Sequence, residues 1–204
     1  MAVYRRLRPP VETPLYTRLK VRFGDVDAFQ RLFVSSKEAS SQLGRWCSDM
    51  YWSFSLAEEQ TRKLEMRVER AFNAHRDAKP VAILDAELAK LKEAAQMVQE
   101  HDFGHLTATL EDLSSKVMEL HTWLQLYFER PSDARCIVFV DRRHTARLLQ
   151  LIFSHLGGPH LRPDTLMGSN TTAGDMNISF RKQFMTLTNF RKGVVNCLVW
   201  LDPA

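Results

Sequence analysis

Apolar residues in the first half of the chain recur at intervals of three and four, the spacing of an amphipathic helix. Two short helices are predicted around Leu15–Phe23 and Asp25–Leu32. Ser35 or Ser36 then begins one long helix, with an apolar stripe formed by Leu43, Trp46, Cys47, Met50, Phe54, Ala57, Leu64 and Val68. A break at Arg76–Pro80 precedes a second helix with Leu84, Leu88, Leu91, Ala95 and Val98. Two such helices joined by a short turn are expected to pack as an antiparallel hairpin.

After a loop at 101–113, the pattern changes to alternating helices and strands. A helix from Ser114 or Ser115 to Phe128 precedes a continuous apolar run, Cys136–Val140, typical of a strand buried on both faces. Helices at 144–156 and 178–190 and strands at 161–167 and 194–200 follow. This order predicts parallel strands joined by right-handed crossovers. We expect the last strand, Val194–Trp200, to form an unpaired edge that promotes self-association.

The predicted fold class is therefore α/β, with a partial parallel sheet of about three strands that follows an all-helical part. The predicted boundaries are an irregular lead-in at 1–13, the helical part at 14–110 and the α/β part at 113–204. The break between the last two parts falls in the loop around Gly104.

Composition narrows the class of protein without identifying a function. Of 204 residues, 45% are hydrophobic, and the formal net charge of +4 permits a polyanionic partner without requiring one. The three cysteines, Cys47, Cys136 and Cys197, form no CxxC pair and indicate a reducing compartment. No secretory signal or apolar run of membrane-spanning length is present. We expect a soluble intracellular protein.

Several motifs of nucleotide and metal chemistry are missing from the sequence. The GxxxxGK[ST] phosphate loop is absent, and Asp85-Ala-Glu-Leu88 falls on a helical pattern that places Asp85 on a solvated face. His101 and His105 have the spacing of a helical zinc pair, but Gly104 disfavours that helix and no third ligand lies nearby. These observations predict neither a nucleotide site nor a metal site.

Basic and polar residues follow the predicted strands, where open α/β folds bind ligands. Arg142, Arg143 and Arg147 follow the first strand, and the polar segment Ser169–Asp175 follows the second. Arginine guanidinium groups and side-chain hydroxyls both suit contacts to a sugar–phosphate backbone. Solvation of a helix start and a flexible connection are the alternative interpretations.

At these residues the chain resembles the Dicer-like proteins of filamentous fungi. The α/β part resembles the second helicase lobe, including its motif IV and the approach to motif V, in Leu113–Val117, Cys136–Leu149, Pro159–Pro163, Leu166–Gly168, Ala173–Arg181 and Phe190–Leu198. The helical part resembles the insertion within that lobe, in Ser36–Ala39 and Leu43–Asp49. The resemblance covers roughly residues 14–199, with the motifs in the family's order.

The resemblance implies a fragment of an ATP-dependent helicase and ribonuclease III enzyme of RNA silencing. Trp200–Ala204 replaces the family's motif V, and motif VI, the first helicase lobe, the PAZ domain and both ribonuclease III domains are not in this sequence. We therefore expect no ATP hydrolysis or RNA cleavage by the chain alone. ATP and Mg²⁺ are implied as cofactors of the complete parent enzyme, and none for this chain.

The implied role is double-stranded RNA binding, in the cytoplasm or nucleus. The RNA contacts that the resemblance implies are Arg142, Arg143, Gly168, Ser169, Asn170, Ser179 and Gln183. The helical hairpin is implied to clamp RNA or to dock an accessory double-stranded RNA-binding protein. One alternative is a pure protein-interaction module that binds its partner through Trp46, Met50 and Trp52. The other is a truncated gene product without a function of its own.

Overall fold

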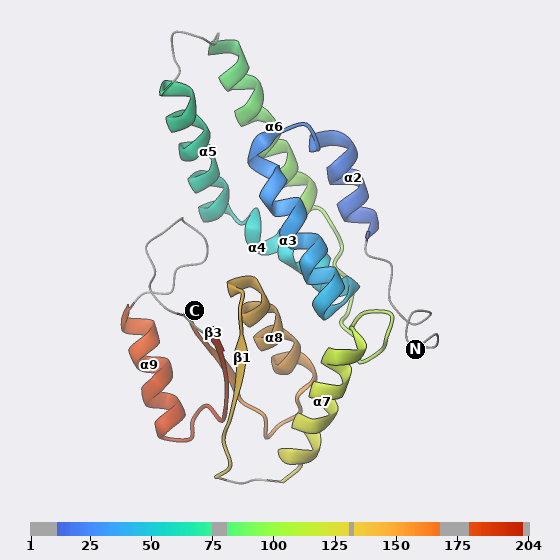
Figure 1. Ribbon diagram of the computed structural model, residues 1–204, viewed down its shortest axis with the longest axis vertical. Helices are drawn as coiled ribbons and strands as arrows, with labels where there is room; N and C mark the ends of the chain where they lie inside the picture. Colours follow the sequence, from blue (N-terminus) through green and yellow to red (C-terminus); the bar gives the residue numbers. More distant parts are fainter. Residues whose placement is uncertain (1–11, 75–80, 131–132, 168–179, 202–204) are drawn as a thin grey trace.

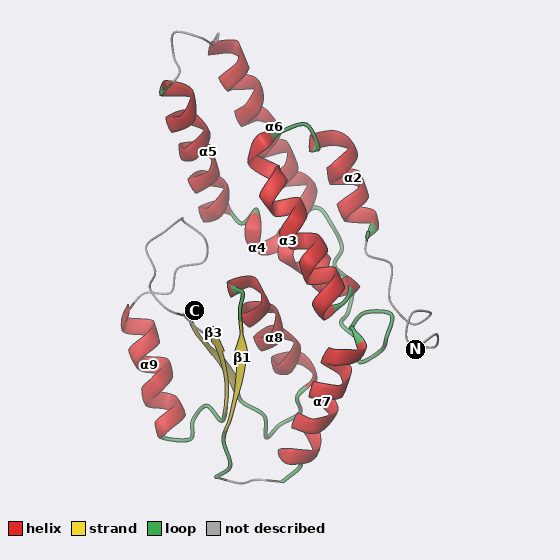
Figure 2. Cartoon of the chain, in the orientation of Figure 1, coloured by secondary structure: helices red, strands yellow, loops and turns green. Residues whose placement is uncertain are grey.

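The computed structural model describes residues 12–74, 81–130, 133–167 and 180–201 (Figure 1). The helices before the sheet are α2 (Pro14–Phe23), α3 (Asp27–Leu43), α4 (Arg45–Ser55), α5 (Glu58–Asn73), α6 (Val81–Gln99) and α7 (Ser115–Tyr127). The remaining elements are β1 (Cys136–Val140), α8 (Arg143–Leu156), β2 (Pro163–Leu166), α9 (Phe180–Arg191) and β3 (Cys197–Leu201). Figure 2 shows the strands between α8 and α9, with the α5–α6 hairpin at the opposite end of the molecule. The predicted class, helices followed by a small parallel sheet, is confirmed.

The predicted long helix is wrong, because its residues form α3, α4 and α5. Gly44 ends α3 with a φ of 124°, a backbone angle that no helix contains. A distant segment crosses this junction: the Ser114 amide donates to the Leu43 carbonyl at 2.8 Å, and the Trp46 amide donates to the Asp112 carbonyl at 3.1 Å. The second break follows Ser55, where α4 ends. Apolar periodicity runs through both breaks and therefore does not reveal them.

Two details of the predicted sheet are also wrong. The strand order is β1-β3-β2, all parallel, so β3 is the central strand, and among the described residues the unpaired edges belong to β1 and β2. β1 is not buried on both faces, because Ile137 is 40% exposed and Phe139 is 64% exposed. α8 packs on the other face, where Val138 joins the core. The self-association expected from an exposed strand edge therefore stays a prediction, now for β1.

Two apolar cores hold the described residues together. The first lies within the helical part and includes Phe23, Phe29 and Trp52. The second joins α3, α4 and α7 to the sheet and α8, through residues such as Trp46, Leu113 and Phe153. Helices α3 and α4 thus contribute to both cores, which fixes the helical part against the sheet. The domain boundaries at 13, 110 and 113 stay a prediction.

The cysteines are all free thiols: Cys47 and Cys197 are buried, and Cys136 is partly buried. Burial raises the pKa of the Cys47 thiol, so the neutral form that packs as a small hydrophobe is favoured. Among the residues that the structure describes, we find no helix with the length and apolar character that a bilayer crossing requires.

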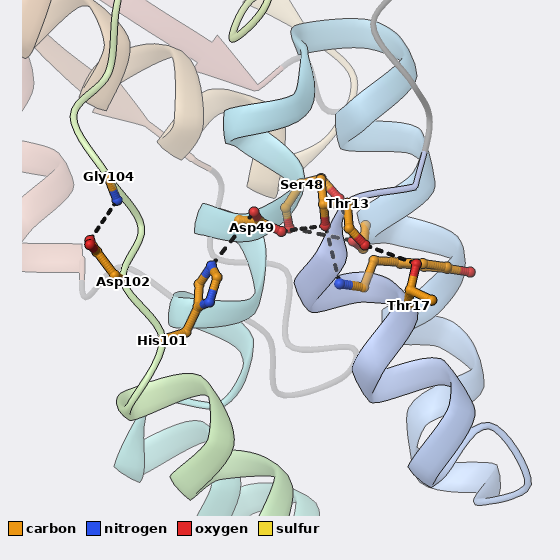
Figure 3. Close-up of polar contacts among 9 residues, drawn as sticks. Thr13, Thr17, Ser48, Asp49, His101, Asp102 and Gly104 are labelled. Carbon is orange, nitrogen blue, oxygen red and sulfur yellow. Dashed lines mark hydrogen bonds and ion pairs between the residues drawn. The ribbon is translucent and has the colours of Figure 1, made fainter.

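Asp49 of α4 joins three segments that are distant in sequence (Figure 3). The Thr13 hydroxyl, just before α2, donates to Asp49 Oδ1 at 2.5 Å and accepts from the Tyr16 amide at 3.1 Å. His101, after α6, places Nε2 3.7 Å from Asp49 Oδ2. Burial raises the pKa of the Asp49 carboxyl, while the Thr13 hydrogen bond and His101 act in the opposite direction. His101 therefore pairs with a carboxylate rather than with His105.

Replacing Thr13 with valine is expected to lower the free energy of unfolding by about 2 kcal/mol. The change removes both the helix cap and a hydrogen bond to a buried carboxylate while keeping the shape of the side chain. Thr13→Ser keeps the hydroxyl and is expected to cost less than about 1 kcal/mol for one lost methyl group. Urea unfolding of the two variants measures the difference, and equal stabilities would contradict the role given to the hydroxyl.

Candidate nucleic-acid interface

The first basic residues of the candidate interface lie at the carboxyl end of β1. Asp141 and Arg142 form the turn that leads into α8, and Arg142 has an extended backbone with φ −128° and ψ 139°. Arg143 is the first residue of α8, and no side chain caps the helix start. In Figure 1 this edge of the sheet faces the end of α5 at which that helix begins. The predicted strand-to-helix turn thus presents both arginines towards the helical part.

A cavity of about 300 Å³ lies between this edge and the helical part. The residues lining it come from α3, α4, α5, the β1–α8 turn, the start of α8 and the end of β3. They are Leu32, Ser35, Tyr51, Ser55, Gln60, Lys63, Leu64, Arg67, Asp141, Arg142, Arg143, His144 and Leu201. We call this cavity the interdomain cleft. Its lining is apolar at Leu32, Leu64 and Leu201 and polar or charged at the other residues.

Four cationic side chains line the interdomain cleft: Lys63, Arg67, Arg142 and Arg143. Carboxylates lie beside two of these cations. Arg142 Nη2 is 3.8 Å from Glu38 Oε1, and the Arg142 side chain is 56% exposed, so this ion pair is weak. Lys63 Nζ is 2.6 Å from Glu59 Oε1, a pair on the surface of α5. Among the described residues the lining holds four cations and one carboxylate, Asp141, and Glu38 and Glu59 lie beside two of the cations. Positive charge thus outnumbers negative charge here, which favours an anionic ligand.

Ring contacts between α4 and α8 hold the two sides of the cleft in place. Tyr51 and His144 meet edge to face with ring centroids 5.3 Å apart. Farther along, the Arg147 guanidinium lies 4.2 Å from the centre of the Phe54 ring. Burial lowers the pKa of Arg147, although the group stays charged at neutral pH. Arg147, which follows β1 with the other two arginines, thus contacts the helical part and does not line the interdomain cleft.

The structure describes three of the seven RNA-contact residues that the resemblance implies. Arg142 and Arg143 lie together in the interdomain cleft. Gln183 is half-buried in the first turn of α9, a helix that begins at the same edge of the sheet (Figure 1). The four others, Gly168, Ser169, Asn170 and Ser179, lie outside the described residues.

The structure adds three residues that sequence reasoning missed: Gln60, Lys63 and Arg67 of α5. Their spacing of three and four places them on one face of the helix. That spacing is visible in the sequence, but nothing local shows that this face of α5 turns towards the β1–α8 turn. In the part of the chain that the structure describes, no three histidine, cysteine or acidic side chains gather as a metal site.

Two of the three residues predicted to bind a partner protein, Trp46 and Trp52, are buried, and the third, Met50, is half-buried. Trp52 is fully buried in the helical core, and Trp46 is 8% exposed and packs beside His155 with ring centroids 6.3 Å apart. Both tryptophans therefore hold this chain together. Trp46 packs beside α8, and Trp52 contacts Phe33 of α3.

Comparison with known proteins places these two parts in one family. The chain is 53% identical over 97% of its length to Dicer-like protein 1 of Phaeosphaeria nodorum. It is 40% identical over 96% of its length to Dicer-like protein 1 of Aspergillus oryzae, and 34% identical over 96% to that of Cryphonectria parasitica. The chain is homologous to a segment of the fungal Dicer-like proteins. It covers 13% of the length of the first two relatives and 12% of the third, and no family model matches it.

The similarity to Dicer-like proteins extends through both the helical part and the α/β part, because the matched region includes nearly the whole chain. The matched region therefore includes all the elements that form the interdomain cleft. The resemblance seen in the sequence motifs is confirmed at the level of the family.

Proposed function

We propose that this chain is a double-stranded RNA-binding segment of a Dicer-like helicase. The observation that carries the proposal is the interdomain cleft, in which cations from α5 and from the β1–α8 turn face one space. Phosphate oxygens of a nucleic-acid backbone match such a lining, because arginine donates to them through two parallel N–H groups and lysine through a point charge. Homology to proteins named Dicer-like protein 1 supports RNA as the polyanion.

The proposed contacts are to the backbone, so binding depends on charge and shape more than on base sequence. A helical face on one side and a strand end on the other let the chain hold a duplex at a fixed orientation. Chemistry on the RNA belongs to the rest of a Dicer-like protein, where ATP and Mg²⁺ act in the complete enzyme. We propose that the chain alone binds RNA and does not hydrolyse ATP; duplex-stimulated ATP turnover by the purified chain would overturn that part.

Replacing both Arg142 and Arg143 with alanine is expected to weaken binding of a short RNA duplex about tenfold at low salt. Each phosphate contact that is lost also reduces the steepness of the salt dependence, so the logarithmic slope should fall by about 1 to 2. Fluorescence anisotropy at a series of salt concentrations measures both quantities. If the affinity and slope remain those of the unsubstituted chain, these arginines do not contact RNA.

A matched control is available at the opposite edge of the sheet. Arg191 ends α9 and Lys192 follows it, and both are exposed. Arg191→Ala with Lys192→Ala removes the same charge from the same part of the chain but outside the interdomain cleft. This control variant is expected to change affinity less than threefold, through general electrostatics alone. Equal losses in both variants would indicate nonspecific attraction rather than a site.

A further inference from the structure

His144 occupies a position in the interdomain cleft that the RNA-binding assignments do not use. It lies one residue beyond Arg143, in the first turn of α8, and lines the same cavity. Its ring is held by the edge-to-face contact with Tyr51, with centroids 5.3 Å apart, and the residue is half-buried. A histidine in this place can add a positive charge to the cleft, and its ordinary titration range lies close to neutral pH.

Burial of the imidazole opposes protonation of His144 when the cleft is empty of anions, and the charges around it act in both directions. On its own segment lie Asp141, Arg142 and Arg143; α3 contributes Glu38, and α5 contributes Lys63 and Arg67. Tyr51 of α4 is the remaining titratable neighbour. Burial lowers the pKa of His144, and Arg142 lowers it further, while Glu38 and Asp141 raise it. Burial is thus the largest influence that keeps the imidazole neutral, and Arg142 adds to it.

We propose that His144 takes up a proton from solvent when a phosphate anion enters the interdomain cleft, and so becomes a further cationic contact for the RNA backbone. The inference rests on the proposed function and extends it to one more binding residue. A phosphate adds negative charge close to the imidazole and offsets both its burial and the repulsion from Arg142. Arginines and lysines stay charged throughout this range, so His144 is the group in the described lining that can respond near neutral pH.

The sign of the effect follows from proton linkage. If the bound state holds more protons than the free state, affinity rises as pH falls, with a limit of tenfold per pH unit for one proton. The window is set by the two protonation equilibria of His144. In the free chain, burial lowers the pKa of His144 below its ordinary value near 6.5. Bound phosphate raises that pKa, so RNA affinity is expected to increase about threefold to tenfold from pH 7.5 to pH 6.0.

The experiment measures binding of a short RNA duplex to the full 204-residue chain at constant ionic strength between pH 6.0 and pH 8.0. His144→Gln, which cannot be protonated, is expected to lose this pH dependence and to match the unsubstituted chain at pH 8.0 within about twofold. His105→Gln is the matched control, because His105 is exposed in the loop after α6, outside the cleft lining. This control is expected to keep the full pH dependence.

A second measurement reports on His144 directly and does not require the substituted chain to fold. The NMR chemical shift of the His144 ring is followed against pH, first in the free chain and then with saturating RNA duplex. A higher titration midpoint in the complex supports the proposal; an unchanged midpoint overturns it. RNA binding with equal pH dependence in His144→Gln rejects the role of His144 and leaves the proposed function intact.

If the duplex does not bind at all, the proposed function fails. The same NMR titration with inorganic pyrophosphate then decides the inference separately. A raised His144 midpoint shows proton-linked anion binding in the cleft. An unchanged midpoint rejects it.

Discussion

Replacing Gly44 with alanine is expected to destabilise the chain by more than about 3 kcal/mol. Gly44 has a φ of 124° and a ψ of 174°, a region of backbone angles that is essentially restricted to glycine. A β-carbon there would lie 2.5 Å from the Leu113 α-carbon and would also overlap the Asp112 carbonyl oxygen. Because both neighbours are backbone atoms, no side chain can rotate away to make room.

The substitution at Gly44 is also expected to disturb the attachment of α7. The segment crossing Gly44 donates and accepts the hydrogen bonds that attach α7 to the α3–α4 junction, including the one from the Ser114 hydroxyl to the Gln42 carbonyl at 2.7 Å. Ser114 also caps α7 by accepting from the Val117 amide. Moving this segment therefore disturbs the second core as well, where Leu113 is fully buried.

Gly104→Ala is the matched control. Gly104 also has a positive φ, 63°, but no atom lies within 4 Å of the position that its β-carbon would take. The substitution is therefore expected to cost only about 1 kcal/mol, the strain of the backbone conformation alone. Chemical denaturation of the two variants separates backbone strain from overlap. Similar losses at both positions would show that the close approach of residues 112 and 113 to Gly44 is not a feature of the folded chain.

Removing the positive charges from both sides of the interdomain cleft is expected to weaken duplex RNA binding by about a hundredfold or more at 100 mM salt. The variant replaces Lys63, Arg67, Arg142 and Arg143 with alanine. Up to four phosphate contacts are lost, so the logarithmic salt slope should fall by about 3. The variant lacking only the α5 pair tests the residues that sequence reasoning missed, and a loss similar to that of the arginine pair is expected.

The control for this experiment replaces Arg62, Arg70, Arg191 and Lys192 with alanine. Arg62 and Arg70 are exposed on α5 but do not line the interdomain cleft. Both fourfold variants change the formal net charge from +4 to zero, so any difference between them reflects position rather than total charge. If they lose affinity equally, the cleft is not the RNA site. Circular dichroism of each variant checks that the helical content is retained.

Most elements that carry their own local signal were predictable from sequence. α6 follows from the spacing of its leucines, α7 from its serine cap, and β1 from its run of apolar and β-branched residues. The position of Arg142 and Arg143 at the end of β1 was also predictable, because parallel strands present their carboxyl ends at one edge of a sheet. These features depend on residues that are close together in the chain.

The helix boundaries at Gly44 and Leu56 could not be predicted, because the apolar spacing continues across both of them. The apolar spacing of α3, α4 and α5 is nearly continuous, since each helix buries a face towards one of the two shared cores. Periodicity records which residues are buried but not whether the backbone turns between them. The hydrogen bonds that join Trp46 to Asp112 and Leu43 to Ser114 show why the chain must turn at Gly44.

Sequence alone determined the family, the succession of helices before a parallel sheet, and the arginines that follow β1. Tertiary structure decided that β3 is the central strand, that Arg147 rests on Phe54, and that Lys63 and Arg67 face Arg142 and Arg143 across a cavity. The physical reason is the separation in sequence between the residues that make contact. Local patterns fix which residues are apolar and where an element can begin, whereas the pairing of faces depends on contacts between residues far apart in the chain.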